Sequence, residues 1–599
     1  MARQTPVVRD SPGLQNFDVV GGRLDGAGHQ GTVLVSDLRR PVTSATMASG
    51  NPEMSLLRLM QGRKSLHLPP PARGPTTGPG MNALTFPLIR FNRHDGSIGT
   101  ATLPGVLAVL MRDEVAAFTA LRPHQRHAWH AFLVQLAALA LLRAGLDTVP
   151  DDEATWCNLL RGLTPDDIDD APWCLVAPPD RPALLQPALP GGNLSELRNL
   201  VLTPDSLDML VTSKTHDLKG GVMAQAAPDD WLFALVTLQT MEGFLGAGNY
   251  GISRMNGGFA NRPALSVAPP GGPGAHLRRD VRRLVAMKGR TPLSNICAER
   301  DGLALVWLSP WDGTASLPAS TLDPLYIEVC RRVRLQTEGA LITARVDGSK
   351  AARITPIPGG VTGDPWAPVR QDKDGLKVLT VDARGFSYKP LVDLLFPRDG
   401  QRAPLQVEVA DDATDGLILI ARALVRGQGK TEGYHERWVP LSRKVSRRGV
   451  PTPTDPVAQM AHDRVQLAGD MASTLRFALF ALFENGPAKV DAGNDAAGRK
   501  AKPFVARFER EVDLTFFEAL WQEAEQDGAD GRRAERAKWL RALLRTADAL
   551  LDEADHAAAK ASRRRFRARV NADGVLHGSV HKHTRLGGYF VIERTPDAI

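Results

Sequence analysis

A stretch rich in glycine and asparagine, GNYGISRMNGGFANR at residues 248–262, could bring the backbone close to a nucleic acid. Glycines leave room for backbone amides to approach a groove or a phosphate. Asparagine amides offer both donors and acceptors to base edges. We therefore treat this stretch as a candidate DNA-binding loop, although a purely structural glycine loop is the alternative. Its candidate contacts are Asn249, Gly251, Arg254, Asn256, Gly257, Gly258 and Arg262.

A second polar stretch precedes this loop in the chain. LVTSKTHDLKGG, residues 210–221, presents Lys214 and Lys219 among hydroxyl side chains and ends in two glycines. Lysine, serine and threonine side chains commonly contact phosphate groups. We expect Lys214 and Lys219 to grip a nucleic-acid backbone.

Histidines are the main candidates for metal chemistry. HQRHAWH places His124, His127 and His130 three residues apart. On a helix the first two share a face and the third has rotated away, so ligation by all three is awkward. A second cluster, HGSVHKH at residues 577–583, follows a basic run and is expected to lie in a solvated tail.

Two further motifs could belong to enzymes. His-Asp pairs at residues 216–217 and 462–463 would fit a metal-dependent nuclease of the HD type, but that chemistry needs ligands on neighbouring helices that the sequence does not reveal. GQGKT at residues 427–431 resembles the end of a phosphate-binding loop, yet Leu424 stands where the motif needs a glycine. A hairpin tip carrying Gln428 and Lys430 is the better interpretation. We predict no catalytic residue, no cofactor and no metal.

Charge favours a polyanionic partner. The 599 residues carry a formal net charge of +7, and residues 531–570 alone contain 12 Lys/Arg against 5 Asp/Glu. A basic patch of this kind attracts nucleic acid, although a solvated helical face would look the same in sequence.

Cysteine usage and hydropathy bear on the compartment. Four cysteines occur, and none stands at CxxC spacing, so neither a zinc knuckle nor a disulfide framework is indicated. The longest apolar run, residues 131–142, contains Gln135 and is too short to span a bilayer. The first residues lack an apolar signal core. We expect a cytoplasmic protein with no membrane partner.

The sequence patterns of the helices and strands that must position these residues predict an α+β protein. Residues 1–80 read as an N-terminal extension ending in a Pro/Gly linker, and residues 81–450 as a large mixed α/β domain. The latter should hold a hairpin turning at Asp95-Gly96, helices near 124–144 and 229–244, and a strand-rich part over 304–440. Apolar stripes over residues 456–570 predict an antiparallel helical bundle, the last stripe continuing into the basic run, with a tail at 571–599.

These segments together resemble the CasA family, the large subunit of the type I-E CRISPR surveillance complex called Cascade. The resemblance rests on motifs in order along residues 81–440: ALTFPLIRFNRHDG, PDDIDDAPWCLVAPPDRPALLQ, TSKTHDLKGG, GNYGISRMNGGFANRPALSV, LVWLSPWDG, LDPLYIEVCRRVRL, TGDPWAPV and YKPLVDLLF. It implies a large α/β domain followed by a four-helix bundle. It also implies a subunit that recognises the short PAM motif on double-stranded DNA, starts strand separation and recruits a helicase–nuclease, while a guide RNA held with other Cascade subunits reads the target.

The resemblance also assigns roles to residues. The 248–258 loop would enter the PAM minor groove, the loop with Lys214 and Lys219 would contact the PAM region, and Gln428 with Lys430 would form a strand-separating wedge. Lys288 is a possible counterpart of the family's lysine finger. Two features depart from the family: the cysteine-rich zinc site of some members is missing, and the 80-residue extension is additional. The alternatives are an HD-type nuclease and a freestanding basic DNA-binding protein whose main contact is KASRRRFRAR at residues 560–569.

Overall fold

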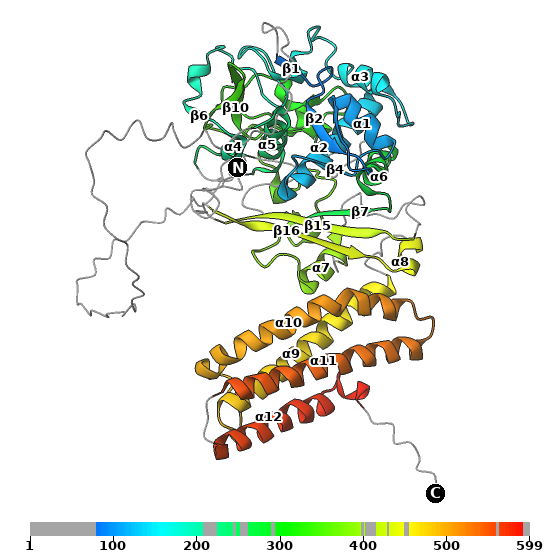
Figure 1. The fold of residues 1–599 in the computed structure, drawn as a ribbon, viewed down its shortest axis with the longest axis vertical. Coiled ribbons are helices and arrows are strands. Elements are labelled where there is room, and N and C mark those ends of the chain that lie inside the picture. Colours follow the sequence, from blue (N-terminus) through cyan, green and yellow to red (C-terminus); the bar gives the residue numbers. More distant parts are fainter. Residues whose placement is uncertain are drawn as a thin grey trace, which may run out of the picture. The chain divides into compact units, whose positions relative to one another are not determined.

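The computed structural model describes these residues: 80–207, 223, 226–243, 247–251, 262–288, 294–396, 400–401, 415–427, 430–448, 455–558 and 562–590 (Figure 1). All of them belong to one unit, Thr76–Ile599. The expected extension over residues 1–80 lies outside the described residues apart from Gly80 and stays a prediction.

Residues 80–448 form the α/β region. Its helices are α1 Leu103–Met111, α2 Arg126–Ala144, α3 Glu153–Arg161, α4 Pro204–Leu207, α5 Pro228–Met241, α6 Gly272–Ala286, α7 Tyr388–Leu395 and α8 Arg443–Arg448. Its strands are β1 Gly80–Asn82, β2 Ile89–Asn92, β3 Ile98–Ala101, β4 Ala117–Phe118, β5 Cys174–Val176, β6 Asn199–Val201, β7 Ala264–Ala268, β8 Leu303–Leu305, β9 Leu322–Ile327, β10 Arg332–Glu338, β11 Leu341–Asp347, β12 Val369–Asp372, β13 Gly375–Val378, β14 Gly400–Gln401, β15 Ile418–Gly427 and β16 Lys430–Pro440.

The strands of the described residues pair into small sheets rather than one large one. Three-stranded sheets have the orders β3-β2-β4, β10-β11-β6, β13-β12-β14 and β16-β15-β7, and two-stranded sheets pair β1 with β5 and β8 with β9. Among these strands only β8 and β9 run parallel. Long connections therefore make up much of the α/β region, and these loops need other partners for their backbone groups.

Local signals in the sequence hold in this region. The hairpin of β2 and β3 turns at Gly96, whose φ of 83° suits glycine. Helix α2 ends at Gly145, which has a left-handed φ of 67°. This helix is buried on nearly all sides, from His127 to Leu141, because it runs through the larger core. The expected second helix is α5, which ends at Met241, three residues earlier than predicted.

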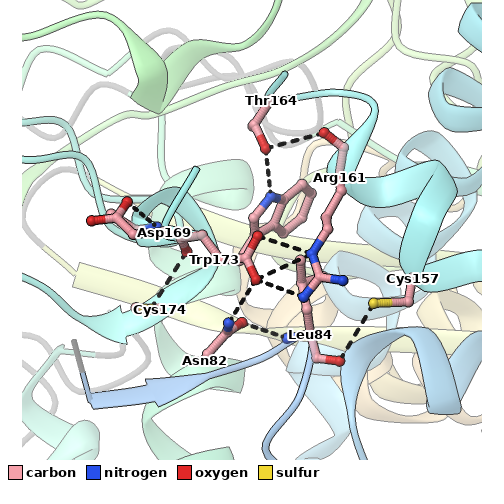
Figure 2. A network of polar contacts seen from close by, with 10 residues as sticks. Asn82, Leu84, Cys157, Arg161, Thr164, Asp169, Trp173 and Cys174 are labelled. Atoms are coloured by element: carbon pink, nitrogen blue, oxygen red, sulfur yellow. Dashed lines mark hydrogen bonds and ion pairs between the residues drawn. The ribbon is translucent and has the colours of Figure 1, made fainter. Parts of the chain in front are cut away.

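The PDDIDDAPW run forms a network of polar contacts that joins distant segments (Figure 2). Asp170 has a left-handed φ of 55°, and its carboxylate accepts hydrogen bonds from Arg161 and from the Asn82 amide at 2.8 and 2.9 Å. Trp173 donates from Nε1 to the Thr164 hydroxyl at 2.9 Å. Asp170 thus connects the first strand to α3 and has a structural role.

Four helices follow as a bundle: α9 Pro456–Phe483, α10 Asp495–Ala524, α11 Ala529–Ala557 and α12 Ser562–Lys582 (Figure 1). The predicted α+β class with a C-terminal helical part is confirmed. Two expectations are wrong. The third stripe does not continue into the basic run, because α11 ends at Ala557. The tail does not begin at residue 571, because α12 runs on to Lys582 and buries Leu576 and Val580.

The bundle shares its core with part of the α/β region. One cluster of buried apolar residues contains Val267 of β7, Leu419 of β15, Leu475 of α9 and Phe516 of α10. Tyr388 of α7 stacks on Phe516 with ring centroids 4.8 Å apart. The sheet β16-β15-β7 therefore packs with the helices that follow it.

Candidate nucleic-acid interface

The sheet β16-β15-β7 connects the glycine-rich loop to the hairpin. Residues 248–262 lead directly into β7, which pairs antiparallel with β15 and begins with Ala264 opposite Arg422. Beyond this pair β15 continues over residues 423–427, which at about 3.4 Å per residue carries the hairpin roughly 17 Å further. Because the strands are antiparallel, the loop arrives at the same end of the sheet as the hairpin tip.

The first end of the glycine-rich loop is fixed by backbone contacts. The Gly248 carbonyl, in a residue with φ of 81°, accepts from the Ser349 amide at 2.8 Å. Gly251 is buried, and a Cβ there would collide with Arg331 and with the carbonyls of Glu242 and Gly243. Gly251 thus forms the base of the loop instead of a surface contact.

Arg331 contacts the same end of the loop. Arg331 is only 7% exposed. Its guanidinium donates to the Gly243 carbonyl at 2.5 Å and to the Cys330 carbonyl at 3.0 Å. Gln239 of α5 accepts from the Arg331 amide at 2.8 Å. The start of the loop is therefore anchored to a helix and a strand.

The second end of the loop is fixed by Arg262, which the sequence analysis counts among the DNA contacts. This residue is 3% exposed and donates to the Gly360 carbonyl and to the Thr362 hydroxyl, the latter at 2.5 Å. Burial lowers the pKa of this guanidinium. In this structure Arg262 faces inward, so we reassign it from contacting DNA to anchoring the loop.

Between these ends, most of the predicted contacts lie outside the described residues. Arg254, Asn256, Gly257 and Gly258 belong to this group. Asn249 is described and exposed. It remains available for a partner.

The lysine-bearing loop is closed at its base by one carboxylate. Asp205 of α4 accepts from the Met223 amide at 2.5 Å and also contacts Arg122. Met223, the residue after the segment 208–222, therefore lies next to α4, from which that segment starts. Lys214 and Lys219 lie outside the described residues.

The predicted hairpin is confirmed by its two strands, because β15 pairs antiparallel with β16. Gly427 pairs with Lys430, so only residues 428 and 429 separate β15 from β16. A register shift between Val425 and Arg426 marks a bulge near the tip, which increases local twist. Gln428 lies outside the described residues, and Lys430 is the first residue of β16. GQGKT therefore spans the turn between β15 and β16, with no helix after it, so the phosphate-binding-loop interpretation is excluded.

The structure places two exposed lysines, Lys350 and Lys288, among the candidate contacts. Lys350 follows Ser349, whose amide holds the glycine-rich loop, so it stands beside that loop's first end. No sequence signal marked Lys350, because the glycine-rich loop that it lies beside is about a hundred positions earlier in the chain. Lys288 is exposed just after α6 with a left-handed φ of 51°.

The three histidines of HQRHAWH do not converge. His124 and His127 are buried, and the His127 ring meets Trp366 edge-on. His130 instead contacts Asp280 of α6, with Nε2 2.8 Å from Oδ2. A search within one helix could not find this partner.

The remaining histidine motifs of the described residues lie on helices of the bundle. His462 contacts the Phe396 carbonyl at 2.9 Å, so the second His-Asp pair has a structural role; the first pair lies outside the described residues. His577 contacts Asp548 at 2.9 Å, and the His581 ring meets Phe590. The expectation of a solvated histidine tail is wrong.

The basic run forms α12, where its arginines divide into two groups. Arg565 pairs with Asp555 at 3.0 Å and Arg569 with Asp573 at 2.9 Å. Arg563, Arg564 and Arg567 are exposed. The second group could contact a polyanion.

The class that this geometry defines is an α+β protein with a helical bundle, in which the chain leaving a glycine-rich loop enters a sheet at the end from which a hairpin extends. None of the helices in the described ranges is long and apolar enough to cross a membrane.

No protein-family model matches the sequence, and no curated protein matches it. Solved structures do match. CasA from Thermus thermophilus aligns with a TM-score of 0.59 at 16% identity, covering 85% of this chain and 99% of that one. The CRISPR-associated protein Cse1 from Acidimicrobium ferrooxidans gives 0.58 at 15% identity, covering 85% and 98%. A chain of a CRISPR RNA-guided surveillance complex gives 0.51 at 16% identity, covering 84% and 100%. The chain therefore has the CasA fold, and the resemblance seen in its sequence is confirmed.

Proposed function

We propose that this protein is the large subunit of a type I-E CRISPR RNA-guided surveillance complex, and that it recognises the PAM on double-stranded DNA. One observation carries the proposal beyond the shared fold. The second end of the glycine-rich loop leads into β7 at the same end of the sheet β16-β15-β7 from which the hairpin extends. A duplex held by the loop would present its next base steps to the hairpin tip.

In this proposal the loop enters the minor groove beside the PAM. Asn249, Arg254 and Asn256 face the duplex, and Gly257 and Gly258 allow close approach. A minor groove distinguishes few base pairs, so recognition there is permissive. Gly251 and Arg262 fix the two ends of the loop, which limits the entropy lost on binding.

The other candidate residues act on the backbone and on base pairing. Lys214 and Lys219 contact phosphates, and Lys350 adds charge beside the glycine-rich loop. Gln428, with Lys430, is the wedge at the hairpin tip. Inserting a rigid tip offsets part of the unstacking cost, which is on the order of a few kcal/mol per step.

The protein itself performs no catalysis in this proposal. Its partners are target DNA, the guide RNA held with other Cascade subunits, and a helicase–nuclease that it recruits. It acts in the cytoplasm.

The first experiment is a tagged pull-down from the native host with sequencing of the bound RNA. The expected result is a discrete RNA with repeat-derived ends together with several smaller protein subunits. Recovery of the protein alone, or with random nucleic acid, would contradict membership in such a complex.

A second experiment measures DNA affinity against salt in the assembled complex. Changing Lys214→Ala and Lys219→Ala together should weaken binding for every PAM and lower the salt slope by roughly one to two units. A matched control, Lys373→Ala with Lys489→Ala, removes the same charge from exposed lysines elsewhere and should change the slope little. A change in PAM preference alone would overturn the phosphate assignment.

A third experiment tests the wedge. Gln428→Ala should leave initial duplex binding unchanged and slow strand opening, followed by fluorescence of a base analogue at the first target position. Gln371→Ala, at an exposed glutamine of β12, is the control. Equal opening rates in wild type and Gln428→Ala would remove Gln428 from the role.

A freestanding DNA-binding protein is the second candidate, because Arg563, Arg564 and Arg567 are exposed on one helix. Deleting residues 560–599 would not test it fairly, since α12 buries Leu576 and Val580 in the bundle. Replacing the three arginines with alanine keeps the core. If this triple variant loses more DNA affinity than the Lys214/Lys219 variant, the second candidate is favoured.

A further inference from the structure

Three side chains of types that bind metal ions converge inside the α/β region, next to the sheet β16-β15-β7. His130 lies on α2, while His276 and Asp280 lie one turn apart on α6. Nε2 of His130 is 2.8 Å from Oδ2 of Asp280, and Nε2 of His276 is 3.3 Å from the same oxygen. One ligand atom from each residue lies within 4.8 Å of the other two. We name this group the histidine site.

A fourth donor stands next to these three. The Ser266 hydroxyl of β7 is 2.6 Å from Nε2 of His276, and Ser266 is 2% exposed. His276 and Asp280 are buried, and the His130 side chain is 14% exposed. The site is thus a polar pocket enclosed by two helices and a strand.

The Nε2 atom of His276 has two polar neighbours, the Ser266 hydroxyl and the Asp280 carboxylate. Nε2 of a neutral imidazole carries either one proton or one lone pair. The Nε2 atom of His276 therefore cannot accept from Ser266 and donate to Asp280 at the same time. An ion at the centre would instead take lone pairs from both imidazoles and from the carboxylate.

The separations also fit a small ion. Zinc binds histidine nitrogen and carboxylate oxygen at about 2.0–2.2 Å, so neighbouring donors of a tetrahedral site lie roughly 3.3 Å apart. Of the two nitrogen–oxygen separations, the 3.3 Å one matches this value and the 2.8 Å one is shorter. The His130 and His276 rings are stacked with centroids 4.1 Å apart, so at least one imidazole must rotate for both Nε2 lone pairs to meet the ion.

We propose that His130, His276 and Asp280 bind one divalent transition-metal ion of the zinc class. Ser266 or a water molecule completes the coordination. Two histidines and one carboxylate are the ligand types that zinc and cobalt accept readily.

The surroundings supply the support that such a site requires. The Trp366 indole Nε1 lies 3.3 Å from Oδ2 of Asp280, and Arg279 donates to Oδ1 at 3.0 Å. Contacts of this kind orient a ligating carboxylate. A cavity of about 420 Å³ is lined by His130 and His276, so an ion and a water molecule can reach the donors.

The ion would have a structural role. It would tie α2 and α6 together beside β7, the strand that receives the glycine-rich loop and pairs with the hairpin. This inference does not depend on the proposed function, because it rests only on the donor atoms.

The test uses the full-length protein, purified without a histidine tag and stripped with a chelator. It is then dialysed against zinc, and bound metal is counted by mass spectrometry. We expect about one zinc ion per chain, and with cobalt the visible absorption of a four-coordinate ion. His276→Gln and Asp280→Asn should each lower bound zinc at least about tenfold, an effect of roughly 1.4 kcal/mol or more.

The matched control is His127→Gln, which changes a buried histidine of the same α2 helix that contacts Trp366. It should keep the full metal content. The proposal is overturned if the wild-type protein binds no zinc or cobalt, a result that needs no variant to fold. It is also overturned if His276→Gln, shown by circular dichroism to be folded, retains zinc, or if His127→Gln loses it equally.

Discussion

Buried arginines stabilise the α/β region and the bundle in different ways. In the α/β region most of them donate to backbone carbonyls, whereas Arg422 of β15 pairs with Glu436 at 2.6 Å. Arg334, 1% exposed, donates to the carbonyls of Ala177 and Pro178 at 2.8 Å and to that of Gln186 at 2.9 Å. Arg353 donates to the Ser309 carbonyl at 2.7 Å.

In the bundle the buried arginine pairs with a carboxylate. Arg464 and Glu523 have fully buried side chains and lie 2.8 Å apart, and Arg536 shares the same glutamate at 3.0 Å. The Arg464 guanidinium also lies 4.6 Å from the ring centre of Trp539. The carbonyl groups inside these helices are already paired with helix amides, so the guanidinium is free to hold a carboxylate.

The difference follows from the backbone. A helix satisfies its own carbonyl groups, whereas long connections between small sheets leave theirs without ladder partners. A guanidinium has five donors in a fixed fork and can serve several such carbonyls at once. The loops that carry the candidate interface therefore depend on buried arginines, Arg331 and Arg262 among them, for their position.

The largest expected effect is from Arg334→Met, which leaves several buried carbonyls without donors. Each unsatisfied group costs about 1–3 kcal/mol, so the free energy of unfolding should fall by roughly 4–6 kcal/mol. Urea unfolding followed by tryptophan fluorescence measures it. The control is Arg198→Met, which removes an exposed partner of Asp347 and should cost less than about 1 kcal/mol. Equal losses in both variants would contradict the carbonyl-bonding role.

Next is Glu523→Gln, which takes the charge partner from the buried Arg464. An uncompensated buried charge should lower the free energy of unfolding by about 3–5 kcal/mol. The comparison variant is Glu553→Gln, whose exposed pair with Arg507 should contribute less than about 1 kcal/mol. Thermal unfolding followed by far-UV circular dichroism reports on the bundle. If Glu523→Gln costs no more than Glu553→Gln, burial does not govern the strength of these pairs.

Asp170→Asn tests a carboxylate-paired arginine inside the α/β region. Hydrogen bonds from Arg161 hold the pKa of Asp170 below its ordinary value, so this stabilisation is present above the unfolded pKa and is lost as pH falls through the lower folded pKa. The variant should be less stable by about 2 kcal/mol near neutral pH. The gap should close as pH falls below about 4. Urea unfolding at a series of pH values measures the gap, and a difference that stays constant across this range would show that Asp170 acts through shape alone.

The smallest expected effect is from Gly251→Ala. A methyl group there would press on Arg331 and on two carbonyls, which should cost about 1–2 kcal/mol and displace the loop. DNA affinity of the assembled complex should fall more than stability does, which a binding titration beside a melting curve can show. Gly578→Ala of α12 has open space around it and should be neutral or slightly stabilising. Unchanged DNA binding in Gly251→Ala would separate the loop from recognition.

Sequence reasoning succeeds where the signal is local. The turn at Gly96, the end of α2 at Gly145 and the hairpin around residue 428 all follow from glycines and apolar spacing within a few residues. It fails at the end of the bundle because α12 has a weak apolar stripe between many arginines. Its buried side, which includes Leu576 and Val580, therefore gives no clear helical signal.

The sequence by itself determined the α+β class, the helical C-terminal part and the order of motifs that identifies the CasA fold, because periodicity and turn residues act over short distances. Only the tertiary structure decided that Arg262 turns inward, that the loop and the hairpin share one end of a sheet, and that His130 meets Asp280 150 positions away. Such contacts depend on which connections lie side by side after folding, and no local pattern records that.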